Sequence, residues 1–173
     1  TTRLALKDSV RTSAGNVVLT TKIDNVSGTN FFGSETQFAV DAVGVTLNPG
    51  DTLTGLGTNN TLTVVDLTPG GQDNLPAGVT LNNIQNVVLN TSGNTAGSGF
   101  STVGVAGVKA LSVVTAGSAN DLAAATNGAH GATVTVNHQS VISGGVTVLG
   151  GTDVTVTANG LGGNVLVGLT AAG

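Results

Sequence analysis

The sequence predicts an all-β protein of short strands rich in Thr, Val and Gly, either a β-solenoid or a β-sandwich. Apolar residues alternate with Thr and Asn, as in TLTVVDL at 61–67 and ATVTVN at 132–137. This alternation places one side of a strand in the core and the other side in solvent. Clusters of Gly, Asn, Ser and Asp separate these segments, as in PGGQDN at 69–74 and NGLGG at 159–163. Such clusters favour tight turns, so strands and turns should follow one another along most of the chain.

Nine segments show the alternating pattern. Threonine suits their outer faces because its branched Cβ fits the pleated backbone while its hydroxyl reaches water. In chain order, the predicted strands are 44–47, 61–67, 78–81, 86–90, 111–114, 132–137, 145–150, 153–159 and 164–169. From residue 132 onward they recur about every ten residues, a spacing shared by sandwiches, barrels and solenoids. The spacing therefore does not distinguish a β-solenoid from a β-sandwich.

Two segments depart from this pattern. The alanine-rich stretch near 119–126 has Asn120 as a candidate N-cap, and it predicts at most one short helix. Residues 1–22 hold four of the five cations of the chain. We expect this segment to be an N-terminal arm or first strand, and residues 23–173 to form the β-rich repeat domain.

The charge balance argues against several classes of partner. Only 8% of the residues are charged, the net charge is −4, and Lys109 is the one cation beyond residue 22. Such a chain cannot neutralise a row of phosphates, and with 2% aromatic residues it offers little for bases to stack on. No apolar run approaches the roughly 18 residues of a spanning helix. We therefore expect neither nucleic-acid binding nor a transmembrane segment.

Groups suited to catalysis are sparse, so we expect no enzymatic activity. The aspartates lie mostly beside turns, where capping of backbone N–H groups explains them without chemistry. His130 and His138 are eight residues apart, and the chain has no cysteine to complete a zinc site with them. We interpret both as solvated turn histidines. A polysaccharide-acting β-helix enzyme is disfavoured by the scarcity of aromatic residues and carboxylates.

Calcium is the strongest cofactor candidate. The phrase DTLT at 51–54 returns as NTLT at 60–63, with Gly55 and Gly57 between the copies. Calcium-binding solenoids repeat a similar glycine and aspartate rhythm, in which carboxylates and carbonyl oxygens supply the ligands. Asn60 replaces the charged ligand in the second copy, so a tight array of sites is not expected. We predict weak calcium ligands at Asp51, Asp66 and Asp153 instead.

The same region resembles a known group of proteins. The run GDTLTGLGTNNTLTV from residue 50, LNNIQNVVLN at 81–90 and VAGVKALSVVTAG at 105–117 resemble segments of bacterial surface-layer and repeats-in-toxin-type secreted proteins. The resemblance implies an exported, extracellular β protein that tiles into a lattice on the cell surface, often with calcium. Its partner would be the protein itself, with cell-envelope polysaccharide as a second candidate. Asn59 and Asn60 depart from the family pattern, which favours Asp there.

These observations together favour a structural role in a self-assembling surface layer. Sheet edges with few charges are poorly defended against strand addition, which a lattice subunit can exploit. The main alternative is an extracellular filament or biofilm matrix in which the basic arm of residues 1–22 adds a strand to the next subunit. A phage or virus decoration protein is a further alternative.

Overall fold

The computed structural model describes residues 10–12, 15–35, 44–66, 75–91, 102, 105–115, 126–128, 133–139, 146–159 and 162–168. These residues form strands, turns and irregular connections, so the all-β class is confirmed. Within these ranges there is no helix long and apolar enough to cross a membrane. The short helix predicted near 119–126 lies outside the described residues, apart from Thr126, which begins a strand.

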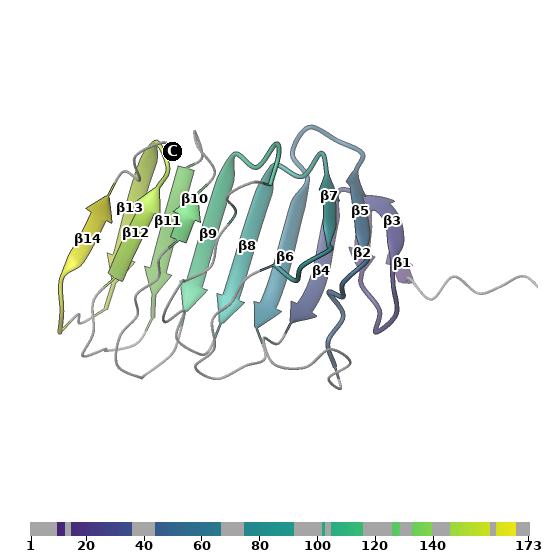
Figure 1. Cartoon of the computed structure of the whole chain (residues 1–173), viewed down its shortest axis with the longest axis horizontal. Helices are drawn as coiled ribbons and strands as arrows, with labels where there is room; N and C mark the ends of the chain where they lie inside the picture. The colour runs from purple at the N-terminus through teal and green to yellow at the C-terminus, as the bar shows by residue number, and fades with distance from the viewer. Residues whose placement is uncertain are drawn as a thin grey trace, which may run out of the picture.

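The strands form one large sheet and two small ones (Figure 1). Sheet A contains, in spatial order, β1 (Val10–Thr12), β2 (Asn16–Val18), β4 (Asn30–Glu35), β6 (Thr61–Asp66), β8 (Asn86–Thr91), β9 (Ala110–Thr115), β11 (Thr133–His138) and β13 (Asp153–Ala158). Sheet B contains β3 (Asn25–Gly28), β5 (Thr52–Gly55) and β7 (Thr80–Asn82). Sheet C contains β10 (Thr126–Gly128), β12 (Val146–Gly150) and β14 (Val165–Gly168).

The connectivity makes these sheets the faces of a β-solenoid. From β2 to β8 the chain passes alternately through sheets A and B, and from β9 to β14 it alternates between sheets A and C. Neighbours within each sheet are parallel, as expected where the chain returns to a sheet after crossing through the opposite one. The antiparallel pair of β1 and β2 is the exception. The coils follow one another along the long axis of the molecule (Figure 1).

The core consists of aliphatic side chains stacked in register from coil to coil. The second residue of β6, Leu62, pairs in register with Phe31 on one side and Val87 on the other, and all three are fully buried. This inward row along sheet A consists of Val17, Phe31, Leu62, Val87, Leu111, Val134 and Val154. Two residues further along the strands, a second row consists of Val64, Leu89, Val113, Val136 and Val156. The predicted alternation of inward Val or Leu with outward Thr or Asn is thereby confirmed.

The predicted strand at 44–47 is wrong. Val45 and Leu47 are buried, as the alternation suggested, but they lie in the irregular connection before β5. The backbone N–H groups of Thr46 and Leu47 both donate to the carbonyl oxygen of Ser34, at 3.0 and 2.9 Å. Two donors that share one acceptor do not form a strand ladder, so the segment buries its apolar side chains without joining a sheet.

At the N-terminal end of sheet A, the chain covers the edge of β2 with its own strand β1. Strand β1 lies antiparallel against β2, and Val17 in β2 is fully buried. Both strands fall within residues 1–22, the predicted N-terminal arm or first strand.

We predict that Leu62→Ala lowers the free energy of unfolding by about 2 to 5 kcal/mol, because it removes buried contacts and leaves a cavity between two coils. Denaturant-induced unfolding measures the change. Val65→Thr is the matched control, since this side chain lies in the same strand but is 44% exposed. Equal effects of the two substitutions would contradict the stacked core.

Candidate functional site

The three predicted calcium ligands lie in three different places. Asp51 immediately precedes β5 in sheet B, whereas Asp66 ends β6 and Asp153 begins β13, both in sheet A. Strands β8, β9 and β11 separate β6 from β13. Within the described part of the chain, no three His, Cys, Asp or Glu side chains lie close enough together to hold a metal ion. The three aspartates therefore do not form one site.

Asp51 caps backbone groups of two successive coils. It is fully buried, and its Oδ1 accepts the backbone N–H of Asp24 at 2.8 Å while Oδ2 accepts that of Asn48 at 2.7 Å. A turn with a positive φ of 96° at Gly50 brings Asp51 back towards Asn48. Burial raises the pKa of the Asp51 carboxyl above 3.8; the two N–H groups act in the opposite direction, and the nearby charge of Asp24 raises it further.

Asp24, which the sequence analysis did not single out, occupies the equivalent position one coil earlier. Its carboxylate accepts the backbone N–H of Thr20 at 2.7 Å and the Thr20 hydroxyl at 3.2 Å. Asn25 begins β3 and Thr52 begins β5, and the two residues are register partners in sheet B. Asp24 and Asp51 each lie one residue before them. The position of an aspartate immediately before a strand is the sequence feature that could have identified Asp24. Both carboxylates hold turns of the solenoid in place through backbone hydrogen bonds.

A network of amides, in which Asn60 and Gln85 are buried and Asn83 is exposed, occupies the turn where calcium-binding repeats favour Asp. The Asn60 Nδ2 group donates to the carbonyl oxygens of Gly57 at 2.8 Å and Asn83 at 2.7 Å, and to Gln85 Oε1 at 3.1 Å. Asn60 Oδ1 accepts the backbone N–H of Gly57 at 2.9 Å. The Asn83 Nδ2 group donates to the carbonyl oxygens of Gly55 and Gly57 at 2.9 and 3.0 Å. These bonds connect two coils.

Close approach of the backbone makes this network possible. A Cβ atom at Gly55 would collide with the carbonyl oxygen of Asn83 and with the Asn60 side chain. The oxygens around Asn60 Nδ2 would also suit a cation, but they surround an N–H donor instead. A carboxylate at position 60 would face the same oxygen atoms but could donate no hydrogen bond to them. The network therefore requires the neutral amide.

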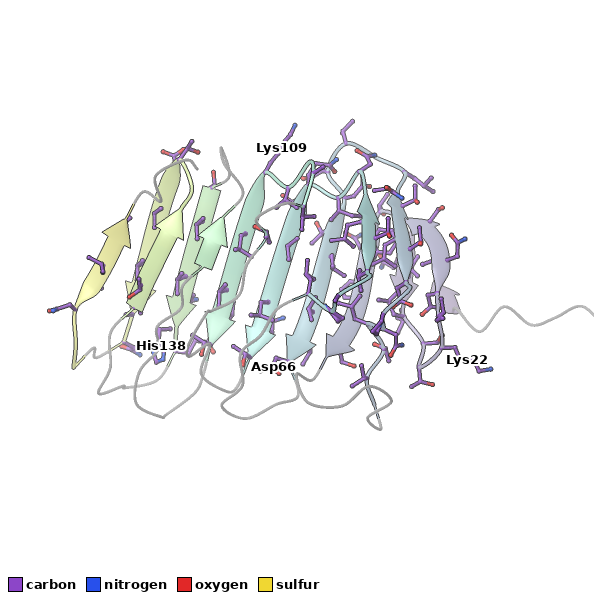
Figure 2. All side chains as sticks on the ribbon, in the orientation of Figure 1. Lys22, Asp66, Lys109 and His138 are labelled. Atoms are coloured by element: carbon purple, nitrogen blue, oxygen red, sulfur yellow. The ribbon has the colours of Figure 1, made fainter. Side chains whose placement is uncertain are left out.

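A row of inward polar side chains runs along the end of the sheet A strands. Asp66, Thr91, Thr115 and His138 occupy successive positions of one register row, and all are buried. The Thr91 hydroxyl donates to Asp66 Oδ2 at 2.6 Å. Figure 2 shows Asp66 and His138 along the same edge of the sheet. These residues lie two positions beyond the second aliphatic row, so they also point inward. At this edge of the sheet the inward side chains are polar.

The interpretation of His138 as a solvated turn residue is wrong. Its side chain is 1% exposed at the end of β11, and neither ring nitrogen has a hydrogen-bond partner among the described residues. The strand extends one residue further than predicted and carries the imidazole inward with the period of two. His130, the other histidine considered, lies outside the described residues.

The C-terminal end of the solenoid exposes its core. Val134 and Val136 of β11 are fully buried, whereas their register partners Val154 and Val156 in β13 are only half-buried. In sheet C, Val165 and Val167 of β14 pair with the buried Val146 and Val148, yet they are 47% and 53% exposed. We call Val154, Val156, Val165 and Val167 the valine end.

Comparisons with known proteins identify no relative: no family model, curated protein or solved structure matches the chain significantly.

We predict that Asn60→Asp lowers the free energy of unfolding by about 3 kcal/mol or more, because it removes the buried donor and places a charge among oxygen atoms. Denaturant-induced unfolding measures the loss. Asn59→Asp is the matched control, since exposed Asn59 only accepts a hydrogen bond, from Asn86 Nδ2 at 2.8 Å. A tolerated Asn60→Asp and an equally tolerated Asn59→Asp would show that the amide network is not needed.

We also predict a pH effect at Asp51. Its raised pKa means that ionisation costs stability in the folded state, so its contribution is most favourable below 3.8 and declines as pH rises through the folded pKa. Asp51→Asn cannot ionise, and it loses one backbone hydrogen bond at every pH. The stability of the wild type relative to the variant should therefore fall between acidic and neutral pH, as measured by denaturant titrations across that range. A rise over the same range would contradict the burial effect.

Proposed function

We propose that this chain is a structural protein that self-assembles outside the cell, as a subunit or domain of an exported surface layer. The observation that carries the proposal is the exposure of apolar side chains on the described strands, beginning with the valine end and the outer edges of β13 and β14, which no described strand covers. Natural proteins usually guard such edges with lysines, prolines or covering segments. From residue 110 onward the sequence contains no Lys, Arg or Pro. An unguarded apolar edge favours association through added strands.

A second apolar surface supports lateral contacts. Val18, Phe32 and Val65 are 46%, 40% and 44% exposed on strands β2, β4 and β6 of sheet A. Val18 and Phe32 are register partners on adjacent strands, so their side chains lie next to each other. We call these three residues the outer patch. A two-dimensional lattice needs contacts in two directions, and an end surface together with a side surface meets that need.

The alternative is an extracellular filament joined through residues 1–22. The repetition of coils along one axis favours such one-dimensional growth. However, β1 pairs with β2 of its own chain, and β2 supplies Val17 to the core. Strand exchange would therefore require β1 to leave this pairing, or the joint to use residues 1–9 alone. Deleting residues 1–9 tests this alternative without removing β1 or β2.

We predict that the purified protein forms two-dimensional sheets in electron micrographs, examined both with calcium and with a chelator. Sheets only with calcium would support the proposed cofactor, and fibres that disappear on deletion of residues 1–9 would support the filament. Monomers under every condition would contradict both.

A pair of substitutions tests the lateral contact in the same assay. Phe32→Thr should reduce sheet formation, because it removes the largest side chain of the outer patch. Leu56→Thr is the control, since Leu56 is 66% exposed but lies in the turn after β5, away from the outer face of sheet A. Equal loss of sheets in both variants would argue against a specific lateral surface.

A further inference from the structure

We propose that the outer face of sheet A binds the same face of a second copy of the chain, forming a two-fold symmetric dimer in which the two sheets pack face to face. This inference rests on the proposed self-assembly and names the lateral contact within it. The side chains of the sheet surface make this contact, and it uses no strand edge.

Five adjacent strands of sheet A each place one apolar side chain on the outer face. Strand β8 contributes Val88 and strand β9 contributes Val114, and both are half-buried. They continue the outer patch of Val18, Phe32 and Val65. Val88 lies in the same register row as Val18 and Phe32, and Val114 lies in the same row as Val65. We call these five residues the outer stripe, which crosses the sheet from β2 to β9.

The exposure of the outer stripe does not depend on where the sequence begins or ends. Each of its five strands has a paired neighbour on both sides, from β1 beside β2 to β11 beside β9. A further strand at either edge of sheet A would leave the stripe as exposed as it is now. The outer stripe therefore belongs to the surface of complete coils, and its side chains can be covered only by something that lies on the face of the sheet.

The outer face is almost uncharged, which limits what can lie on it. Among its outward positions from β2 to β13 whose side chains are described, Asp153 is the only charged residue, and the others are Val, Phe, Ala, Thr, Ser and Asn. A charged partner surface would lose water here without gaining opposite charges. A second copy brings an equally uncharged face. Interface centres are likewise poor in charge and rich in aromatic residues such as Phe32.

A row of amides borders the outer stripe where the strands of sheet A begin. Asn30 Nδ2 donates to Oδ1 of its register partner Asn16 at 2.8 Å, and Asn86 Nδ2 donates to Asn59 Oδ1 at 2.8 Å. Because these amides already have partners within the chain, covering them removes fewer hydrogen bonds to water. The row is therefore suited to be the polar rim of an interface whose apolar centre is the outer stripe.

The size of the outer face fits a reversible dimer. Seven strands from β2 to β13 span about 29 Å at 4.8 Å per spacing, and a six-residue strand is about 20 Å long. A face of about 600 Å² on each copy gives a total of about 1,200 Å², the lower limit for specific interfaces. A two-fold axis through the face places each outer stripe on the other, with the sheets about 10 Å apart.

Sedimentation over a range of protein concentrations tests the dimer, with two lysine substitutions. Val88→Lys puts a charge within the outer stripe and should weaken dimerisation about tenfold or more. Thr54→Lys is the matched control, since Thr54 is also half-buried but points outward from sheet B, where its register partners are Ser27 and Asn82. It should change the dissociation constant by less than about threefold. Circular dichroism establishes that both variants remain folded.

Thiol reactivity identifies the face that is covered. The chain has no cysteine, so Thr63→Cys gives one thiol on the outer face of sheet A, and Thr54→Cys gives one on that of sheet B. The Thr63→Cys variant should react with a thiol reagent about tenfold more slowly when roughly nine-tenths of the protein is dimeric, because only the monomer exposes this face. The Thr54→Cys variant should react at the same rate at every concentration. Association through the ends of the solenoid would leave both thiols equally reactive.

A monomer at all concentrations, equal reactivity of the two thiols, or a dimer unaffected by Val88→Lys would overturn this inference. A monomer that instead sediments with phosphatidylcholine vesicles would assign the outer stripe to a membrane and overturn it as well. The proposed function can fail separately. A dimer with the expected protection but no sheets in electron micrographs would retain this contact and reject the surface layer. Sheets that persist in the Val88→Lys variant would retain the surface layer and reject this contact as its basis.

Discussion

The stacking of inward aliphatic side chains, in register along parallel strands, is the interaction on which the rest of the structure depends. A single coil is too thin to bury its own apolar residues, so each coil is stabilised by the coils above and below it. Leu62 illustrates this, because it is fully buried only between Phe31 and Val87 of the neighbouring coils. The same dependence requires the turns to keep a constant spacing between coils. The caps formed by Asp24, Asp51 and Asn60 serve that need.

The dependence on neighbours also explains why the two ends differ. A terminal coil lacks one neighbour and must be covered by something else. Strand β1 meets this need at the N-terminal end, where it pairs antiparallel with β2 and therefore does not continue the parallel stack. Beyond β13 and β14, no described residue covers the last strands. The inward valines are fully buried in β11 and β12 but only partly buried in β13 and β14.

The sequence predicted most strands from β6 onward, but it missed β2 to β5 and β10, and it did not predict how the strands are arranged. Alternation located the later strands within one or two residues, because their inward and outward positions differ sharply in polarity. It could not distinguish a solenoid from a sandwich, because the coils are unequal in length. From Phe31 to Leu62, Val87, Leu111, Val134 and Val154, successive register partners are 31, 25, 24, 23 and 20 residues apart. The coils therefore have no fixed repeat length that the sequence could reveal. The pairing of Asn60 with Gln85 depends on this register and could not be derived without it, whereas the burial of His138 follows from the alternation once β11 is extended by one residue.

Asn60 shows how a solenoid turn can be held together without a bound ion. Carbonyl and amide oxygens from two coils converge there, and they would repel one another unless something positive lay between them. A cation can fill that role, but the turn then depends on its concentration in solution. The Asn60 amide supplies positively polarised hydrogens from within the chain, at 2.7 to 3.1 Å from three oxygens. The bonds form whenever the chain folds, since Asn60 is fully buried and its donors have no access to competing water. At this turn, cohesion between coils is therefore a property of the sequence itself.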